Sequence, residues 1–240
     1  MIALALVLAL GDGASPIQKA PAYAVATTPA PPTLGPQSAE RRPPPVRTTV
    51  IDNATVTVTR LRFAPGSGET VHTHDFPLVI VQLTDGDVVD LTVSDARGRG
   101  PRVHGLVTFV PAGTEHAVVN AGEQPFEMMA VAIKPTRKPA SAAPPTDAPP
   151  GITRTTLLDN DVVRVVRVEF TPGSREPAHT HPNDLVTLQV NAGRLQVRVG
   201  SRRTDARRAV GFVQFVPSNV SHAYSSRGDR TIEVLSFSIK

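Results

Sequence analysis

The stretch VHTHDFPLVIV (residues 71–81) places two histidines two positions apart and then continues into mostly apolar sequence. Residues i and i+2 of a β-strand face the same side, so His72 and His74 would present both imidazoles to one face. Imidazole is the side chain that most commonly ligates metals in proteins. The stretch therefore predicts a strand that carries two metal ligands.

The same pattern occurs again 107 residues later, where AHTH (178–181) carries His179 and His181. Longer segments on both sides recur as well. They are RTTVIDN (47–53) with RTTLLDN (154–160), RLRFAPGSGE (60–69) with RVEFTPGSRE (167–176), and GLVTFVPAGTEHA (105–117) with GFVQFVPSNVSHA (211–223). One deleted residue explains why the last pair is offset by 106 residues. The chain is thus an internal duplication of one unit.

A third histidine belongs to each repeat, His116 in the first and His222 in the second. Six of the seven histidines therefore form two equivalent sets of three. The sets are His72, His74 and His116, and His179, His181 and His222. The seventh histidine, His104, precedes a glycine in a turn and is expected to be an ordinary surface residue. A lone histidine is usually structural, but a duplicated set of three favours a functional role.

Both repeats show the period of two that is typical of strands with one wet face. Charged and apolar residues alternate in 60–63, in 167–170 and in LQVRV (195–199). Turn sequences such as PGSG, TDG and NAG separate these short runs, and no stretch has the pattern of an amphipathic helix. An all-β fold of antiparallel sandwiches or barrels is predicted, with about 90 residues per repeat, enough for one core each.

The chain divides into five segments by composition. They are a signal peptide (1–24), a proline-rich disordered tether (25–45), a first β domain (46–134), a proline-rich linker (135–150) and a second β domain (151–240). The apolar run of the first ten residues is too short to span a bilayer, and Ala22 and Ala24 supply the small residues of a cleavage site. The run lacks a preceding Lys or Arg, so an uncleaved anchor is the alternative. We expect a periplasmic or secreted protein without a membrane span in the mature chain.

The two repeats resemble the cupin superfamily, which is defined by two motifs. The first is G-x5-H-x-H-x3–4-E-x6-G, and the second is G-x5-P-x-G-x2-H-x3-N. The first motif matches at Gly66, His72, His74 and Gly86, and at Gly173, His179, His181 and Gly193. The second matches at Gly105, Pro111, Gly113, His116 and Asn120, and at Gly211, Pro217 and His222, where Asn219 and Ser226 replace the other two residues. The resemblance implies two tandem cupin barrels of the jelly-roll or double-stranded β-helix type, a bicupin, similar to bacterial cupin domain proteins.

The resemblance also implies that the six histidines ligate metal, with the three of each repeat converging inside one barrel. The glutamate of the first motif is missing, and the motif register assigns its place to Val79 and Val186. Four acids lie close enough in sequence to be considered as substitutes. Asp75 should face the opposite side, Asp184 could reach inward from a loop, and Glu69 and Glu176 lie in the preceding turn and are expected to face solvent.

Three neutral imidazoles without an acid would leave more positive charge on a bound divalent ion, which favours an anionic small-molecule substrate. Such ligands accept Fe, Zn, Mn, Ni or Cu, so the sequence does not distinguish the metal. The protein is predicted to be a metal-binding bicupin, either a dioxygenase-like or other small-molecule metalloenzyme or a non-catalytic metal- or ligand-binding module. No catalytic residue is identified by the sequence.

Three further side chains are matched or contrasted between the repeats. Tyr224 follows His222 by two residues and should share its inward face, where repeat 1 has Val118. It either hydrogen-bonds a ligand or is a core tyrosine with a satisfied hydroxyl. Gln82 and Gln189 are expected to cap backbone groups or to support a metal ligand.

Basic residues exceed acidic ones by 25 to 21, and five arginines lie in one short stretch. They are Arg198, Arg202, Arg203, Arg207 and Arg208. No aromatic residues are interleaved for base stacking, so we expect a solvated hairpin and no nucleic-acid partner. With no cysteine, neither disulfides nor thiolate ligands are available. The two barrels are expected to pair with each other within the chain.

Overall fold

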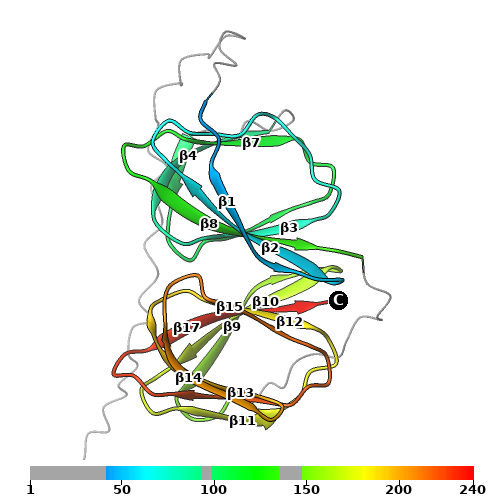
Figure 1. Ribbon diagram of the computed structural model, residues 1–240, viewed down its shortest axis with the longest axis vertical. Coiled ribbons are helices and arrows are strands. Elements are labelled where there is room, and N and C mark those ends of the chain that lie inside the picture. The colour runs from blue at the N-terminus through cyan, green and yellow to red at the C-terminus, as the bar shows by residue number, and fades with distance from the viewer. Residues whose placement is uncertain (1–41, 93–98, 136–147) are drawn as a thin grey trace, which may run out of the picture. The chain divides into compact units, whose positions relative to one another are not determined.

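The computed structural model describes residues 42–92, 99–135 and 148–240, and its regular elements are seventeen β-strands (Figure 1). The predicted signal peptide, most of the predicted tether and the central part of the predicted linker lie outside these residues. Within the described ranges, no helix has the length and apolar character needed to cross a membrane. The prediction of an all-β fold is confirmed.

Repeat 1 consists of two antiparallel sheets that curve around a common interior (Figure 1). The five-stranded sheet has the order β1-β2-β8-β3-β6, and the three-stranded sheet has the order β5-β4-β7. The strands are β1 (Val46–Asp52), β2 (Val56–Phe63), β3 (Leu78–Gln82), β4 (Gly86–Thr92), β5 (Arg99–Arg102), β6 (Val107–Val110), β7 (His116–Asn120) and β8 (Phe126–Ile133).

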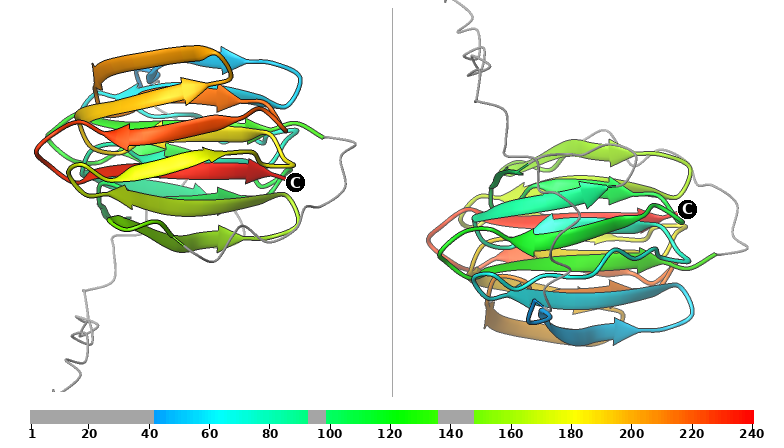
Figure 2. Two further views of the ribbon diagram at one scale, coloured as in Figure 1. Left: turned by 90° about the horizontal axis from the view of Figure 1, so that it is seen from below. Right: turned by 90° about the horizontal axis from the view of Figure 1, so that it is seen from above.

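Repeat 2 has the same architecture with one more paired strand (Figure 2). Its sheets have the orders β15-β12-β17-β10-β9 and β11-β16-β13-β14. The strands are β9 (Ile152–Asp159), β10 (Val163–Phe170), β11 (Arg175–His179), β12 (Leu185–Gln189), β13 (Gly193–Val199), β14 (Arg202–Arg208), β15 (Val213–Val216), β16 (His222–Ser226) and β17 (Ile232–Ile239). The prediction of two tandem barrels is thus confirmed.

The five-stranded sheets bury apolar side chains on both faces. In β2, Val56 and Val58 are buried on the outer face, whereas Leu61 and Phe63 are buried inside the barrel. The outer-face residues belong to one apolar cluster that draws on β2, β3 and β8 of repeat 1 and on β10, β12 and β17 of repeat 2. Because the inner face is packed only toward one end, the other end of each barrel interior is left for a site.

The packed end of repeat 1 is built around two fully buried aromatic rings. Phe63 and Phe126 stack with their ring centroids 4.7 Å apart. Gly86 lies against this pair, and a Cβ atom there would come within 2.8 Å of Phe126. Gly193 is related to Ile232 in the same way in repeat 2, also at 2.8 Å. These glycines of the first motif therefore allow a close approach between strand and core.

Replacing Gly86 by alanine is expected to lower the free energy of unfolding by about 1–3 kcal/mol, because the added methyl group overpacks the Phe126 ring. Denaturant unfolding followed by circular dichroism measures this change. Gly100→Ala is the matched control, since a Cβ at Gly100 would meet no atom within 4 Å. An equal loss of stability in both variants would contradict the overpacking explanation.

The β13–β14 hairpin carries the arginine-rich stretch. Arg198, Arg202, Arg203 and Arg207 are exposed, as expected for a solvated hairpin. Arg208 differs, because it is buried and its guanidinium lies 4.1 Å from the centroid of the Phe212 ring. The expectation of a fully solvated run is wrong at this last position, where the strand turns back toward the barrel and burial lowers the arginine pKa.

Candidate metal centres

In each repeat, antiparallel pairing brings the His-x-His segment beside the later histidine. His72 and His116 form an isolated bridge in which each backbone N–H donates to the other's carbonyl at 3.0 Å. His179 pairs with His222 at the corresponding point of β11 and β16. The ligand atoms of each set of three lie within 4.8 Å of one another. The structure thus brings together all six histidines as two triads.

The second-motif turn fixes the remaining histidine of each triad through the backbone. The N–H of Gly113 donates to the carbonyl of His74 at 2.9 Å, and the N–H of Asn219 donates to that of His181 at 2.7 Å. Both turn residues have positive φ, 73° and 60°. Asparagine is one of the few side chains that adopt this left-handed region readily. The departure from the motif at Asn219 therefore preserves the turn.

The spacing of the ring nitrogens fits a shared metal ion. The Nε2 atoms of His72 and His74 are 3.1 Å apart, and those of His179 and His181 are 3.0 Å apart. Two imidazole nitrogens at about 2.1 Å from one ion lie roughly 3.0–3.4 Å apart for bond angles between octahedral and tetrahedral values. The residues present therefore fit a three-histidine site for a divalent metal.

Hydrogen bonds to the backbone fix which ring nitrogen is available. Four of the histidines bring Nδ1 to the carbonyl oxygen of the residue two positions earlier. These contacts are His72 to Thr70 at 2.8 Å, His116 to Thr114 at 3.0 Å, His179 to Pro177 at 2.8 Å and His222 to Val220 at 3.2 Å. A carbonyl only accepts, so Nδ1 carries the proton and Nε2 keeps its lone pair for a ligand.

Burial also favours the neutral imidazole that a metal requires. Desolvation first, and then the neighbouring histidines, lower the pKa of His74 to about 4. The same causes lower the pKa of His181 to about 4. Burial lowers the pKa of His222 as well. At pH 7 these rings are uncharged in the folded protein and ready to bind metal without losing a proton.

The metal-free protein should lose stability as the pH falls from about 6.5 toward 4. Over this range the unfolded chain protonates His74 and His181, while the folded chain keeps them neutral. The unfolded state then binds more protons, so the free energy of unfolding falls with pH and levels off below about 4. Urea unfolding of chelator-treated protein at pH 7.5 and 5.5 measures the effect. A His74→Gln/His181→Gln variant should show a smaller difference between the two pH values, and an unchanged difference would contradict the assignment.

The place of the missing acid is occupied by leucine. Val79 and Val186 are fully buried in the outer-face apolar cluster and do not face the triads, so the motif register placed them wrongly. Strand alternation instead turns Leu78 and Leu185 inward, where each lines the cavity beside its triad. An apolar side chain thus stands where the family motif has an anionic ligand.

Glu69 and Glu176 were expected to face solvent, and the structure shows that this is wrong. Their side chains are only 6% and 9% exposed, and they pair with Arg47 and Arg154, respectively. Each carboxylate approaches the Nε2 of a triad histidine. The distance is 4.0 Å from Glu69 to His72 and 3.8 Å from Glu176 to His179. In repeat 2 a register shift in β11 between Glu176 and His179 is the physical reason, since the extra residue turns both side chains to the same face.

The other two acids do not join the triads. Asp75 is exposed, as expected. The carboxylate of Asp184 accepts hydrogen bonds from the Ser218 N–H and the Thr55 hydroxyl, both at 2.8 Å, and does not line the cavity. His104 is exposed and lies outside both triads, which confirms it as a surface residue.

Each triad opens into a cavity inside its barrel. The cavity of repeat 1 has a volume of about 230 Å³ and that of repeat 2 about 460 Å³. Tyr224 lines the second cavity, which confirms that it shares the inward face of His222. Gln82 lines the first, whereas Gln189 caps the backbone by donating to the Asn191 carbonyl at 2.9 Å. Both cavities therefore combine a metal-binding set with an Arg–Glu pair whose glutamate is buried.

Comparisons with known proteins agree with this architecture. A family model described as Cupin domain matches residues 166–238. The beta-alanine degradation protein BauB of Pseudomonas aeruginosa is 40% identical over 93 residues, which cover 39% of this chain and 97% of that protein. The fold and the duplicated histidine sites define a bicupin. The chain belongs to the cupin superfamily.

Solved structures share the fold at low sequence identity. AerE from Microcystis aeruginosa has a TM-score of 0.62 at 13% identity, covering 82% of this chain and 98% of that one. Salicylate 1,2-dioxygenase from Pseudoaminobacter salicylatoxidans has a TM-score of 0.62 at 12% identity, covering 78% and 72%. Oxalate decarboxylase from Bacillus subtilis, described with Mn(II) centres, has a TM-score of 0.61 at 13% identity, covering 83% and 74%.

Proposed function

We propose that this protein is a divalent-metal-binding bicupin that acts on a small anionic substrate, as a dioxygenase-like or other small-molecule metalloenzyme. The observation that carries the proposal is the pair of three-histidine triads, each opening into a buried cavity beside an Arg–Glu pair. A bound ion would supply Lewis-acid polarisation of a substrate oxygen and, if redox-active, electron transfer. Since all three protein ligands are neutral, its charge would attract an anion.

The side chains around the triad have separate parts to play in such a reaction. The backbone carbonyls hold the imidazole rings in place through Nδ1. Arg154 pairs with the carboxylate of Glu176 and orients it, and this carboxylate lies 3.8 Å from the Nε2 of His179, close enough to the triad to accept a proton from a bound substrate. Leu185 and Val168 line the same cavity and limit the access of water.

Two solved relatives support an anionic substrate by their names. Salicylate 1,2-dioxygenase and oxalate decarboxylase both act on small carboxylates, and both share the two-barrel fold. Their identity to this chain is too low to transfer a substrate. A small carboxylate is therefore the substrate class that we propose for this chain, without naming the compound.

The first test is the metal content of protein purified without chelators. About two ions per chain are expected, one for each triad. Oxygen uptake is then followed with small carboxylates, thiols and diketones. A redox-active metal with substrate-dependent uptake would support the dioxygenase-like version. A redox-inactive metal without uptake would contradict that version, and protein that binds no metal would contradict the proposal as a whole.

Metal-dependent ligand binding without turnover is the second candidate function. It is favoured by the leucines at the acid position, because Leu78 and Leu185 leave both triads without an anionic ligand. Equilibrium binding of carboxylates to metal-loaded protein, with no product formed over many hours, would favour this candidate over the enzyme.

The setting of the protein is also part of the proposal. We infer export to the periplasm or outside the cell from the apolar run and the small residues at Ala22 and Ala24. The apolar cluster drawn from both repeats supports pairing of the barrels within one chain. The arginine-rich stretch has no interleaved aromatic residues, and we propose no nucleic-acid partner. Amino-terminal sequencing of protein from the periplasmic or culture fraction should find Val25 first, and a full-length chain in the cytoplasm would contradict export.

A further inference from the structure

The interiors of the two barrels differ in their hydroxyl groups at a set of equivalent positions. Four equivalent positions that line both cavities are apolar in repeat 1 and carry hydroxyl groups in repeat 2. The pairs are Ile80 and Thr187, Val118 and Tyr224, Ala130 and Ser236, and Ala132 and Ser238. The replacements come from three different strands of repeat 2, β12, β16 and β17. The second cavity thus carries four hydroxyl groups, contributed by both of its sheets, at positions where the first carries none.

The Tyr224 hydroxyl is the group that points most directly to a ligand. The residue is 6% exposed, and its hydroxyl oxygen has no hydrogen-bond partner among the described residues. Thr187 lies beside it and lines the same cavity. A buried hydroxyl without a partner destabilises the folded protein, and a ligand that bonds to it would recover this loss. Val118 leaves no such group in repeat 1.

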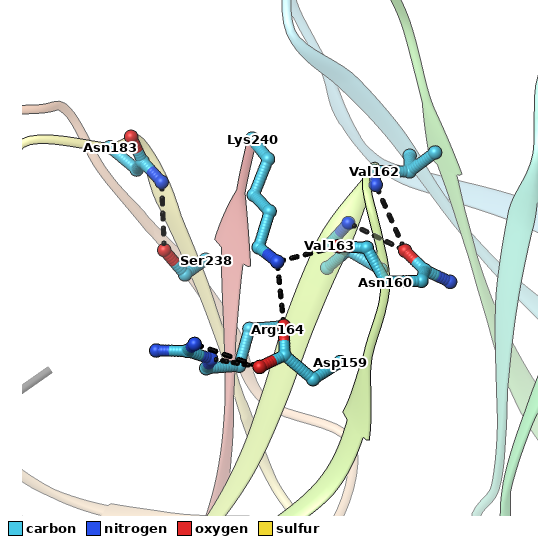
Figure 3. A network of polar contacts seen from close by, with 8 residues as sticks. All are labelled: Asp159, Asn160, Val162, Val163, Arg164, Asn183, Ser238 and Lys240. Carbon is cyan, nitrogen blue, oxygen red and sulfur yellow. Dashed lines mark hydrogen bonds and ion pairs between the residues drawn. The ribbon is translucent and has the colours of Figure 1, made fainter. Parts of the chain in front are cut away.

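The Ser238 hydroxyl already has a hydrogen-bond partner, as Figure 3 shows. The Asn183 amide donates to the Ser238 hydroxyl at 3.2 Å. Arg164 and Asp159 also line this cavity, and the Asp159 carboxylate accepts from Arg164 at 2.8 Å and from Lys240 at 2.6 Å (Figure 3). The network fixes the rim at this place. Tyr224, Thr187 and Ser236 remain as the hydroxyls that face the cavity.

The volumes of the two cavities also favour the repeat 2 cavity as the ligand-binding site. The second, at about 460 Å³, is in the range of small-molecule sites, about 300–1,000 Å³, and the first, at about 230 Å³, is below it. A metal-bound carboxylate leaves the rest of a small acid pointing along the cavity wall. At the four matched positions the repeat 2 cavity carries hydroxyl groups and the repeat 1 cavity carries aliphatic side chains, while the threonines of the repeat 1 cavity (Thr57, Thr59, Thr108 and Thr114) lie at other positions.

We propose that the two sites have diverged in ligand class, and that the repeat 2 cavity binds a small hydroxycarboxylate whose hydroxyl group bonds to Tyr224. This rests on the proposed function, since the carboxylate is held at the metal of the His179–His181–His222 triad. Tyr224 donates to or accepts from the ligand hydroxyl, and Thr187 and Ser236 complete a polar wall. The repeat 1 cavity lacks these groups and does not select a hydroxyl.

Isothermal titration calorimetry of the zinc-loaded full chain tests the proposal with two probes, L-malate and succinate, which differ by one hydroxyl group. Malate should bind one equivalent per chain, about 5- to 10-fold more tightly than succinate, the contribution of one or two hydrogen bonds. Tyr224→Phe should remove this preference and leave succinate binding unchanged. Ser238→Ala is the matched control, because that hydroxyl already bonds to Asn183.

Variants of the triads assign the site. His179→Ala/His181→Ala should abolish malate binding, and His72→Ala/His74→Ala should preserve it; thermal unfolding checks that each variant is folded. Equal affinity for the two acids, a preference that survives Tyr224→Phe, binding at repeat 1, or no binding of either acid to zinc-loaded protein would each overturn the inference while leaving the metal sites intact. Failure of the protein to retain zinc would overturn the proposed function, and the inference with it.

Discussion

Alanine in place of His222 is expected to remove the metal from repeat 2 and to leave repeat 1 loaded. The ring supplies one of the three neutral ligands of this triad, and its Nδ1 is bonded to the Val220 carbonyl, which orients Nε2 toward the ion. Replacing a group that merely orients a ligand costs about 10–100-fold in affinity, so loss of a ligand should cost at least about 100-fold. Metal analysis after dialysis should show the content fall by half.

His116→Ala should have the reciprocal effect, and the two changes together should leave the protein without metal. His104→Ala is the control, because this exposed histidine lies outside both triads and should keep the full content. Retention of metal at full stoichiometry by the double variant would show that the ion is held elsewhere. That result would remove the basis of the proposed function.

The second large effect concerns stability. Phe126→Ala is expected to lower the free energy of unfolding by about 3–5 kcal/mol, because a fully buried ring is lost from the packed end of repeat 1. Its stacking with Phe63 is lost as well. Urea unfolding followed by far-ultraviolet circular dichroism measures the change. The dependence of the unfolding free energy on urea concentration (the m-value) should be the same in the variant and the unsubstituted protein, which verifies that the same transition is compared.

Phe212→Ala is the control for this variant. Its ring is 40% exposed and contacts the Arg208 guanidinium, so its loss should cost about 1 kcal/mol or less. The Phe126→Ala variant should also tolerate alanine at position 86, since the ring that a Cβ of Gly86 would meet is gone. Additive losses in the Gly86→Ala/Phe126→Ala double variant would contradict the packing described for this end of the barrel.

The sequence was sufficient to predict the fold because two signals agreed. The alternation of apolar and charged residues predicted strands, and the offset of 107 residues showed that one architecture occurs twice. The histidine triads followed from the same offset. Each of these signals is local or repeats along the chain, and each can therefore be read without knowing where the strands lie in space.

Two predictions at the sites were wrong for different reasons. Val79 and Val186 were assigned to the acid position by counting residues along a motif that allows either of two spacings, and the alternation of the strand selects the other one. Glu69 and Glu176 were placed in solvent because they lie in the turn that precedes each His-x-His segment. In repeat 2 a register shift between Glu176 and His179 brings these two side chains to one face, and no residue pattern in the sequence signals such a shift.

A signal for the glutamates did exist. Arg47 and Arg154 match across the repeats at the same offset as Glu69 and Glu176, so a duplicated acid and a duplicated base could have been paired. The inward turn of Arg208 had no such signal. It depends on the contact with Phe212, which only the folded hairpin creates.

In four of the histidines the Nδ1–H donates its hydrogen bond to a main-chain carbonyl oxygen. The side chain of the residue that supplies this carbonyl is therefore free to vary. Threonine provides the oxygen at position 70 and proline at position 177, and threonine at 114 is matched by valine at 220. Different amino acids at equivalent positions thus give the same imidazole orientation. Saturation mutagenesis should find that these four positions tolerate most substitutions that preserve the local backbone conformation. Sequence searches that score residue identity alone will overlook these main-chain contacts.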